Sequence, residues 1–169
     1  MDLRPKIKNN LTKTDKLLEI IGKILLCLMW GITIYVFVNL PEIIPVHFNA
    51  AGNANRYGNK ITLLILPVIA TIIYAGITKL NNYPHLFNYM IKITEKNAAF
   101  QYTVATRMLR YVKLAVLIIF TLLILFTYLS VVKITKGIGI WFLPFTFGIL
   151  FIPTLIMLIK STGNKNQIK

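Results

Sequence analysis

The chain has 169 residues, of which 56% are hydrophobic and only 14% are charged, and its mean hydropathy is +0.68. Soluble domains carry charge on about a quarter of their residues, so this composition excludes an ordinary soluble protein and indicates an integral membrane protein. The formal net charge of +14 would suggest nucleic-acid binding in a soluble domain. Here the basic residues stand at the edges of apolar runs, where they report membrane topology, and no nucleic-acid partner is expected.

The N-terminal segment, residues 1–23, is basic and is expected to lie in the cytoplasm. Thr14 or Asp15 is expected to start a helix that leads into the first apolar run. That run is too long for a signal peptide and no small-residue cleavage pattern follows it, so no cleavable signal is expected. It contains Cys27, the single cysteine of the chain, which cannot form an internal disulfide.

Four apolar runs are long enough to cross the roughly 30 Å hydrocarbon core of a bilayer, for which about 20 helical residues suffice. They cover residues 24–40, 61–78, 114–132 and 137–159. Pro67 in the second run, and Pro144 and Pro153 in the fourth, predict kinks or gaps in the helical hydrogen bonding. The predicted fold is an all-α integral membrane protein with four transmembrane helices, arranged as a first hairpin (24–78) and a second hairpin (114–159).

The distribution of basic residues predicts the orientation. If the N-terminus is inside, the cytoplasmic segments hold 15 Lys and Arg residues, and the outer loops hold four, namely Arg56, Lys60, Lys133 and Lys136. This bias follows the positive-inside rule. Both termini, including the tail 160–169, are therefore expected in the cytoplasm, and the loop 41–60 between the first two helices is expected on the extracytoplasmic side.

Residues 79–113 form a second basic segment on the predicted cytoplasmic side. Residues 81–84 give a turn signal, and Thr94 opens a helix. Apolar residues then recur at spacings of three and four, at Phe100, Val104, Met108 and Tyr111. A basic amphipathic segment at a membrane boundary favours contact with anionic lipid headgroups. No nucleophile with a partnered base is evident in the sequence, so no catalytic residue is predicted and the chain is not expected to be an enzyme.

The loop 41–60 is the longest polar segment between two apolar runs. Pro41 and Pro45 stand within five residues of each other, and Gly52 and Gly58 follow among four asparagines. Proline and glycine break helices, while asparagine tolerates left-handed backbone and bonds its own main chain. We therefore expect an ordered turn structure in this loop.

The residues of this loop also resemble a known family. The order Ile44-Pro45-x-His47-Phe48-Asn49, then Gly52, then Tyr57-Gly58-x-Lys60 is similar to the bacterial membrane family called domain of unknown function 1648, which forms the front part of SdpI-type immunity proteins. The resemblance implies a location in the bacterial cytoplasmic (plasma) membrane. It suggests immunity or envelope sensing against a membrane-active peptide. The chain departs from the family at residues 53–55, where an acidic residue is common.

The candidate binding residues all lie in this loop, and they are His47, Asn49, Gly52, Arg56, Gly58 and Lys60. His47 either recognises a ligand or packs at the interface. Two interpretations are open for the basic residues. In one, Arg56, Lys60 and backbone N–H groups hold an anion such as a lipid headgroup. In the other, Lys60 simply marks the membrane boundary. A metal site needs three or four ligands, which this loop does not supply, so neither a metal nor a cofactor is expected.

Two other functions stay open at this point. No Asp, Glu, Arg, Lys or His stands in the apolar runs after Lys23, which argues against a pump or coupled transporter acting alone. A small transporter or subunit acting as an oligomer, and a structural accessory that docks on a membrane complex through residues 79–113, are the alternatives. The expected partners are the lipid bilayer, anionic lipid headgroups, and a toxic peptide or another membrane protein.

Overall fold

The computed structural model describes residues 4–7 and 10–163. Within them the elements are α1 (Lys13–Asn39), β1 (Ile43–Phe48), β2 (Ala54–Asn59), α2 (Ile65–Leu80), α3 (Glu95–Val131) and α4 (Phe142–Gly163). The short 3₁₀ helices η1 (Lys60–Leu64) and η2 (Pro84–Leu86) precede α2 and α3. Lys8, Lys165 and Lys169, which were counted among the basic residues of the predicted cytoplasmic segments, lie outside the described residues. So does the tail beyond residue 163.

Four of these helices are long and apolar enough to span a membrane, with η1 and α2 counted together as Lys60–Leu80. The predicted number of membrane-spanning helices is therefore confirmed for the described residues. Large apolar side chains along α1, α2 and α4 stay exposed, which suits helices whose outer faces meet lipid rather than water.

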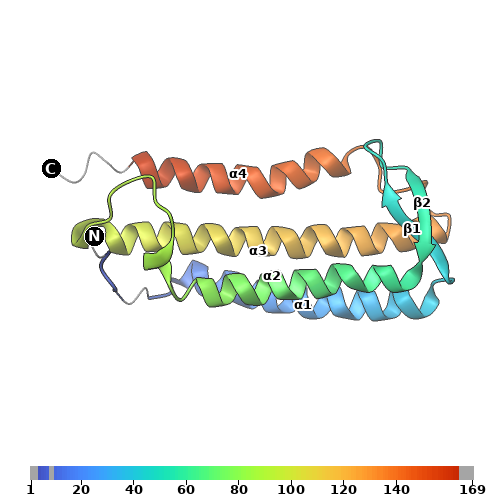
Figure 1. The fold of residues 1–169 in the computed structure, drawn as a ribbon, viewed down its shortest axis with the longest axis horizontal. Helices are drawn as coiled ribbons and strands as arrows, with labels where there is room; N and C mark the ends of the chain where they lie inside the picture. Colours follow the sequence, from blue (N-terminus) through green and yellow to red (C-terminus); the bar gives the residue numbers. More distant parts are fainter. Residues whose placement is uncertain (1–3, 8–9, 164–169) are drawn as a thin grey trace.

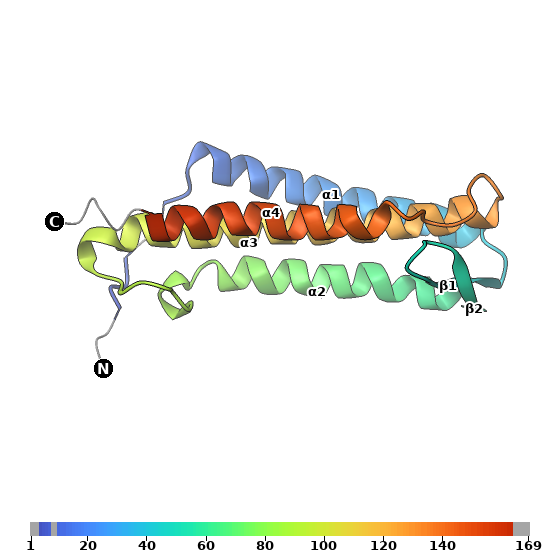
Figure 2. The ribbon, with the colours of Figure 1, turned by 90° about the horizontal axis from the view of Figure 1, so that it is seen from above.

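The helices run up and down beside one another, and α3 is the central one (Figure 1). It packs on α1, α2 and α4, whereas α4 packs chiefly on α3. Buried side chains of α1, α2 and α3 form the main core, including Met29, Ala70 and Leu117. The start of α1, the end of α4 and the α2–α3 connection lie at one end of the bundle, here called the terminal end; the sheet and the α3–α4 loop (residues 132–141) lie at the other, the hairpin end (Figure 2).

The helix starts follow local capping. α1 begins one residue after Thr12, whose hydroxyl accepts a hydrogen bond from Asp15 N (3.2 Å), while Asp15 Oδ2 accepts one from Thr12 N (3.0 Å). This reciprocal arrangement satisfies two N–H groups that a helix start leaves free, and it places the start before the expected Thr14. Thr94 is the N-cap of α3, as predicted.

The prolines interrupt the spans less than predicted. Pro67 occupies the first turn of α2 and Pro144 the first turn of α4, where a helix needs no N–H donor. Only Pro153, among the described prolines, lies in a helix interior. The fourth helix begins at Phe142 and not at Gly137, because the residues before it take up the turn that contacts the sheet.

The loop between the first two helices differs from the all-α prediction, because it contains an antiparallel two-stranded sheet. Ile43 lies opposite Asn59 and Ile44 opposite Gly58, and the register shifts on both sides of His47. Isoleucine, valine and phenylalanine in β1 favour extended backbone. Pro45 is tolerated because each strand of a two-stranded sheet has an unpaired edge. The sequence reading gave weight to the prolines and glycines and so missed the strands.

At the terminal end, residues 4–7 and the α2–α3 connection pack against the first turns of α3. Tyr102 Oη donates to Pro5 O (2.9 Å), and Tyr89 Oη donates to Pro84 O (2.8 Å). The Arg4 guanidinium donates to Phe87 O and lies 5.6 Å from the Tyr89 ring centroid. Burial raises the pKa of Tyr89 above its ordinary value, so this phenol stays protonated and keeps donating.

Candidate functional site

The hairpin turn is closed by Asn49. Its backbone N–H donates to Asn53 O (2.9 Å), and its carbonyl accepts from Gly52 N (2.8 Å). Its side-chain Oδ1 accepts from Asn53 N at 3.0 Å. The predicted binding residue Asn49 thus uses its side chain to hold the turn, in the way asparagine commonly does.

Gly52 joins this turn to the α3–α4 loop. Its φ is +79°, and its carbonyl accepts a hydrogen bond from Ile138 N at 2.9 Å. A Cβ at Gly52 would stand 2.4 Å from Gly139 N, and one at Gly137 would stand 2.1 Å from Gly52 O. Only glycine permits backbone this close at positive φ. The sequence reading named Gly52, but it did not foresee Gly137 and Gly139 as partners.

Gly58 and Lys60 shape the base of the hairpin. A Cβ at Gly58 would meet the Val46 side chain at 3.2 Å. Lys60 Nζ donates to Leu40 O (3.2 Å) and pairs with Glu42 Oε1 (3.2 Å). Its ammonium also lies 5.2 Å from the Phe37 ring centroid. Lys60 therefore ties the base of the hairpin to the end of α1.

His47 and Arg56 are exposed, as is Asn49, and His47 and Arg56 lie opposite each other in the sheet. His47 Nδ1 lies 2.6 Å from Asn55 Oδ1, and because the oxygen can only accept, the ring Nδ1–H donates. In the neutral ring, Nε2 is then an acceptor. His47 can thus offer an oriented acceptor to a ligand N–H group.

Two hollows, here called the hairpin hollows, flank His47 and Phe48. One has a volume of about 310 Å³ and is closed by Gly139, Phe142 and Leu143. The other, of about 380 Å³, lies among β1, the start of α2 and the last turns of α3. Both include Ile138 in their lining, which is mostly apolar. The sequence reading found His47 but not the hollows, because their walls come from four separate parts of the chain.

A cluster of buried charges lies at the terminal end, between α1 and α3. Arg107 Nε donates to Asp15 Oδ1 (2.8 Å), Arg110 Nε to Glu19 Oε1 (2.8 Å) and Lys113 Nζ to Glu19 Oε2 (2.6 Å). These five residues are called the ion network below. The Lys113 side chain is fully buried, and its ammonium stands 4.4 Å from the Tyr74 ring centroid.

The ion network was not predicted from the sequence. The basic residues of 79–113 were expected to form a lipid-facing surface, whereas those from 107 to 113 contact the acids of α1. A signal was present: Arg107, Arg110 and Lys113 recur at a spacing of three, and Asp15 and Glu19 at a spacing of four, so each set lies on one helix face.

The described residues contain no group of three or more His, Cys, Asp or Glu side chains that could hold a metal ion. Both ends offer hydrogen-bonding groups, charges and apolar surface.

Comparison with known proteins supports the relationship suggested by the loop. Residues 24–71 match the family described as "Domain of unknown function (DUF1648)", which confirms the resemblance over this part of the chain. An "Uncharacterized protein" of Archaeoglobus fulgidus is 38% identical over 86 residues, which cover 46% of this chain and 47% of the relative. The chain thus spans about half the length of the curated relative it matches. No solved structure matches.

Proposed function

We propose that this multi-pass membrane protein resides in a bacterial cytoplasmic membrane and recognises a membrane-active peptide through its hairpin end, in immunity or envelope sensing. The observation that carries the proposal is the pair of apolar hairpin hollows that meet at the exposed His47. The transporter and accessory alternatives remain predictions of the sequence.

The hollows suit the chemistry of such a peptide. Membrane-active peptides are amphipathic and gather at the bilayer surface with apolar side chains directed inward. Binding pockets begin at about 300 Å³ and combine an apolar lining with a few placed polar groups. Each hollow can accept a bulky apolar side chain, while His47 Nε2 can accept a hydrogen bond from the peptide backbone.

The surrounding structure supports recognition by a preformed surface. The contacts of Gly52 with the α3–α4 loop and of Lys60 with Leu40 and Glu42 fix the hairpin at both ends. A surface fixed before binding loses little conformational entropy when a ligand arrives. In this proposal Gly52, Gly58 and Lys60 hold the shape, Asn49 closes the turn, and His47 and Arg56 contact the ligand.

The sidedness required by the proposal comes from the charge distribution. The terminal end carries most of the basic residues and the hairpin end carries Arg56, Lys60, Lys133 and Lys136. The positive-inside rule then assigns the terminal end to the cytoplasm and the hairpin end to the outer surface, where an external peptide arrives.

The test is complementation of a deletion strain challenged with a panel of membrane-active peptides. Wild-type protein should restore survival to at least one peptide, and the double variant His47→Ala/Arg56→Ala should lose most of that protection at equal membrane abundance. The matched control, Lys133→Ala/Lys136→Ala, removes charge at the same end outside the hairpin hollows and should protect like wild type.

Two results would contradict the proposal. One is a double variant that protects as well as the wild type. The other concerns sidedness, which can be measured with Asn53→Cys in a Cys27→Ser background. A membrane-impermeant maleimide should label this cysteine in intact cells, and labelling only after lysis would place the hairpin on the wrong side.

A further inference from the structure

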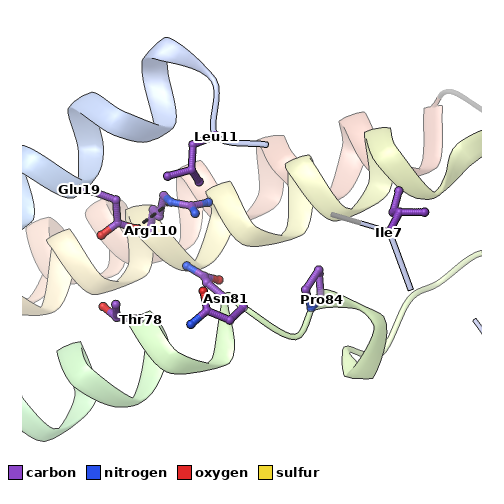
Figure 3. A pocket seen from close by; sticks show the side chains of 8 residues that line it. Ile7, Leu11, Glu19, Thr78, Asn81, Pro84 and Arg110 are labelled. Atoms are coloured by element: carbon purple, nitrogen blue, oxygen red, sulfur yellow. Dashed lines mark hydrogen bonds and ion pairs between the residues drawn. The ribbon is translucent and has the colours of Figure 1, made fainter. Parts of the chain in front are cut away.

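A cavity of about 400 Å³ lies at the terminal end, among α1, α3 and the end of α2. Polar side chains line its inner part, among them Glu19, Asn81 and Arg110, and Ile7 and Leu11 lie at its apolar side. Figure 3 shows Asn81 and Arg110 turned toward the same space from different elements. The hairpin proposal does not use this cavity.

Two buried side chains in this cavity have unused hydrogen-bonding groups. Among the described residues, neither Nδ2 nor Oδ1 of Asn81 has a partner, and Arg110 Nη1 also has none. Asn81 is 8% exposed and Arg110 is 4% exposed. Arg110 uses Nε on Glu19, and its Nη1 stands 4.0 Å from Asp15 Oδ1, beyond hydrogen-bond reach. Buried polar groups are costly to leave unpaired, so these three atoms are available to pair with a ligand.

The charge of the site favours an anion. In the ion network three cations face two carboxylates, so one positive charge is unbalanced. Guanidinium groups bind phosphate oxygens well, because their N–H groups diverge in a fixed plane. The Asn81 amide presents N–H donors on Nδ2 and an acceptor at Oδ1, and a hydroxyl group can pair with either. A phosphate ester that carries hydroxyl groups would satisfy all three unused atoms.

The depth of the cavity suits a lipid headgroup. From Lys113 to Val131, α3 rises by about 27 Å at 1.5 Å per residue. The hydrocarbon core is roughly 30 Å thick, so when the hairpin end of α3 is at one membrane boundary, the ion network is at the other. Headgroup phosphates lie at this level.

We propose that this cavity binds a phosphate ester bearing hydroxyl groups, in which Arg110 Nη1 donates to the phosphate and the Asn81 amide pairs with a hydroxyl. A glycerol-phosphate lipid headgroup and a soluble glycerol phosphate share this chemistry, and the experiment separates them. A choline headgroup has no hydroxyl and does not satisfy Asn81 Oδ1.

The experiment measures the unfolding temperature of the purified full chain in delipidated detergent, alone and with phosphatidylglycerol, phosphatidylcholine or glycerol 3-phosphate. Phosphatidylglycerol in large excess should raise the wild-type Tm by roughly 5 to 10 °C, and phosphatidylcholine should raise it by less than half as much. A rise of the same size with glycerol 3-phosphate assigns the site to a soluble ester, and a rise with phosphatidylglycerol alone assigns it to the lipid.

The key variant is Asn81→Leu, which replaces the unpaired amide by an apolar group of similar size. It should unfold without lipid at or above the wild-type Tm and lose most of the phosphatidylglycerol-induced rise. The matched control is Asn88→Leu, an exposed asparagine of the same connection outside the cavity, and it should keep the full rise.

Several outcomes would overturn the proposal. For the wild type, these are an unchanged Tm with either phosphate ester, or a rise in Tm with phosphatidylcholine equal to that with phosphatidylglycerol. For Asn81→Leu, one is a lipid-induced rise in Tm as large as that of the wild type. The other is a lower Tm without lipid, which would mean that the amide is already paired. Native mass spectrometry of the wild type gives a readout independent of any variant. From an equimolar lipid mixture the chain should retain phosphatidylglycerol over phosphatidylcholine, and equal retention would also overturn the proposal.

Discussion

The two ends of the bundle are held together by different means. At the hairpin end, the backbone of the hairpin packs against the backbone of the α3–α4 loop. Gly52 O accepts a hydrogen bond from Ile138 N, and glycines in both segments allow this close contact. At the terminal end, buried charged side chains join α1 to α3. The first arrangement leaves most hairpin side chains at the surface, whereas the second places its polar side chains in the interior.

This difference indicates what each end can tolerate. A backbone joint depends on the absence of a side chain at a few glycines, and neighbouring positions such as His47 and Arg56 are free to change with the ligand. A buried ion network depends on every partner, because a charge that loses its counterion remains desolvated. We therefore expect substitutions around the hairpin to reduce stability little and substitutions in the ion network to reduce it strongly.

The largest effect should come from Glu19→Gln. The change removes the carboxylate that pairs with both Arg110 and Lys113 and leaves two buried cations short of a counterion. We expect a loss of about 3 kcal/mol in the free energy of unfolding, measured by denaturant titration in detergent. The control is Glu42→Gln, which breaks the pair with Lys60 at a carboxylate that is 73% exposed, and it should cost less than about 1 kcal/mol. Equal losses at the two positions would remove the contrast between the ends.

A smaller effect is expected from Gly52→Ala. The methyl group would collide with the backbone of Gly139, at a residue whose φ is +79°, so the hairpin must move away from the α3–α4 loop. We expect a loss of about 1 to 3 kcal/mol and faster proteolysis within residues 49–53. Gly31→Ala, in a helix with nothing within 4 Å of the new Cβ, should be neutral or stabilising. An unchanged proteolysis rate for Gly52→Ala would show that the joint does not hold the hairpin.

The smallest effect is expected from Asn55→Ala. It removes the partner of His47 at an exposed position, so the change in stability should stay below about 0.5 kcal/mol. The same substitution at the terminal end makes the comparison direct. The Asn97 amide is buried and bonds Thr94 N and Lys92 O, and Asn97→Ala should cost about 1 to 3 kcal/mol. Thermal unfolding of the two variants side by side measures the difference in stability. A larger loss of stability for Asn55→Ala than for Asn97→Ala would contradict the expected tolerance of the hairpin.

Much of the fold could be predicted because its determinants are local. Four apolar runs gave the four helices, Thr94 gave the start of α3, and the spacing of prolines, histidine and glycines in 41–60 gave the family resemblance. The candidate residues His47 and Gly52 were also found this way. Each of these features depends on residues close together in the sequence.

The remainder depends on contacts between distant residues. The partners Glu19 and Lys113 are 94 positions apart in the sequence. Gly52 and Gly139, whose backbones are in contact, are separated by about half of the chain. The apolar stripe in α3 was only partly right for the same reason: Val104 is buried, but Phe100 is 40% exposed, and Gln101 and Arg110 outside the stripe are buried. The acids of α1 and the packing of the other segments decide which face of α3 turns inward, and a periodicity within α3 carries no information about them.

The separation of the network partners also bears on how the protein is made. Asp15 and Glu19 leave the ribosome more than 90 residues before the cations that bind them, which is about 5 to 20 s at ordinary rates of translation. Throughout that interval their carboxylates have no counterion from α3. We therefore expect the ion network to form only after the third helix has been made, so that the terminal end is assembled in steps.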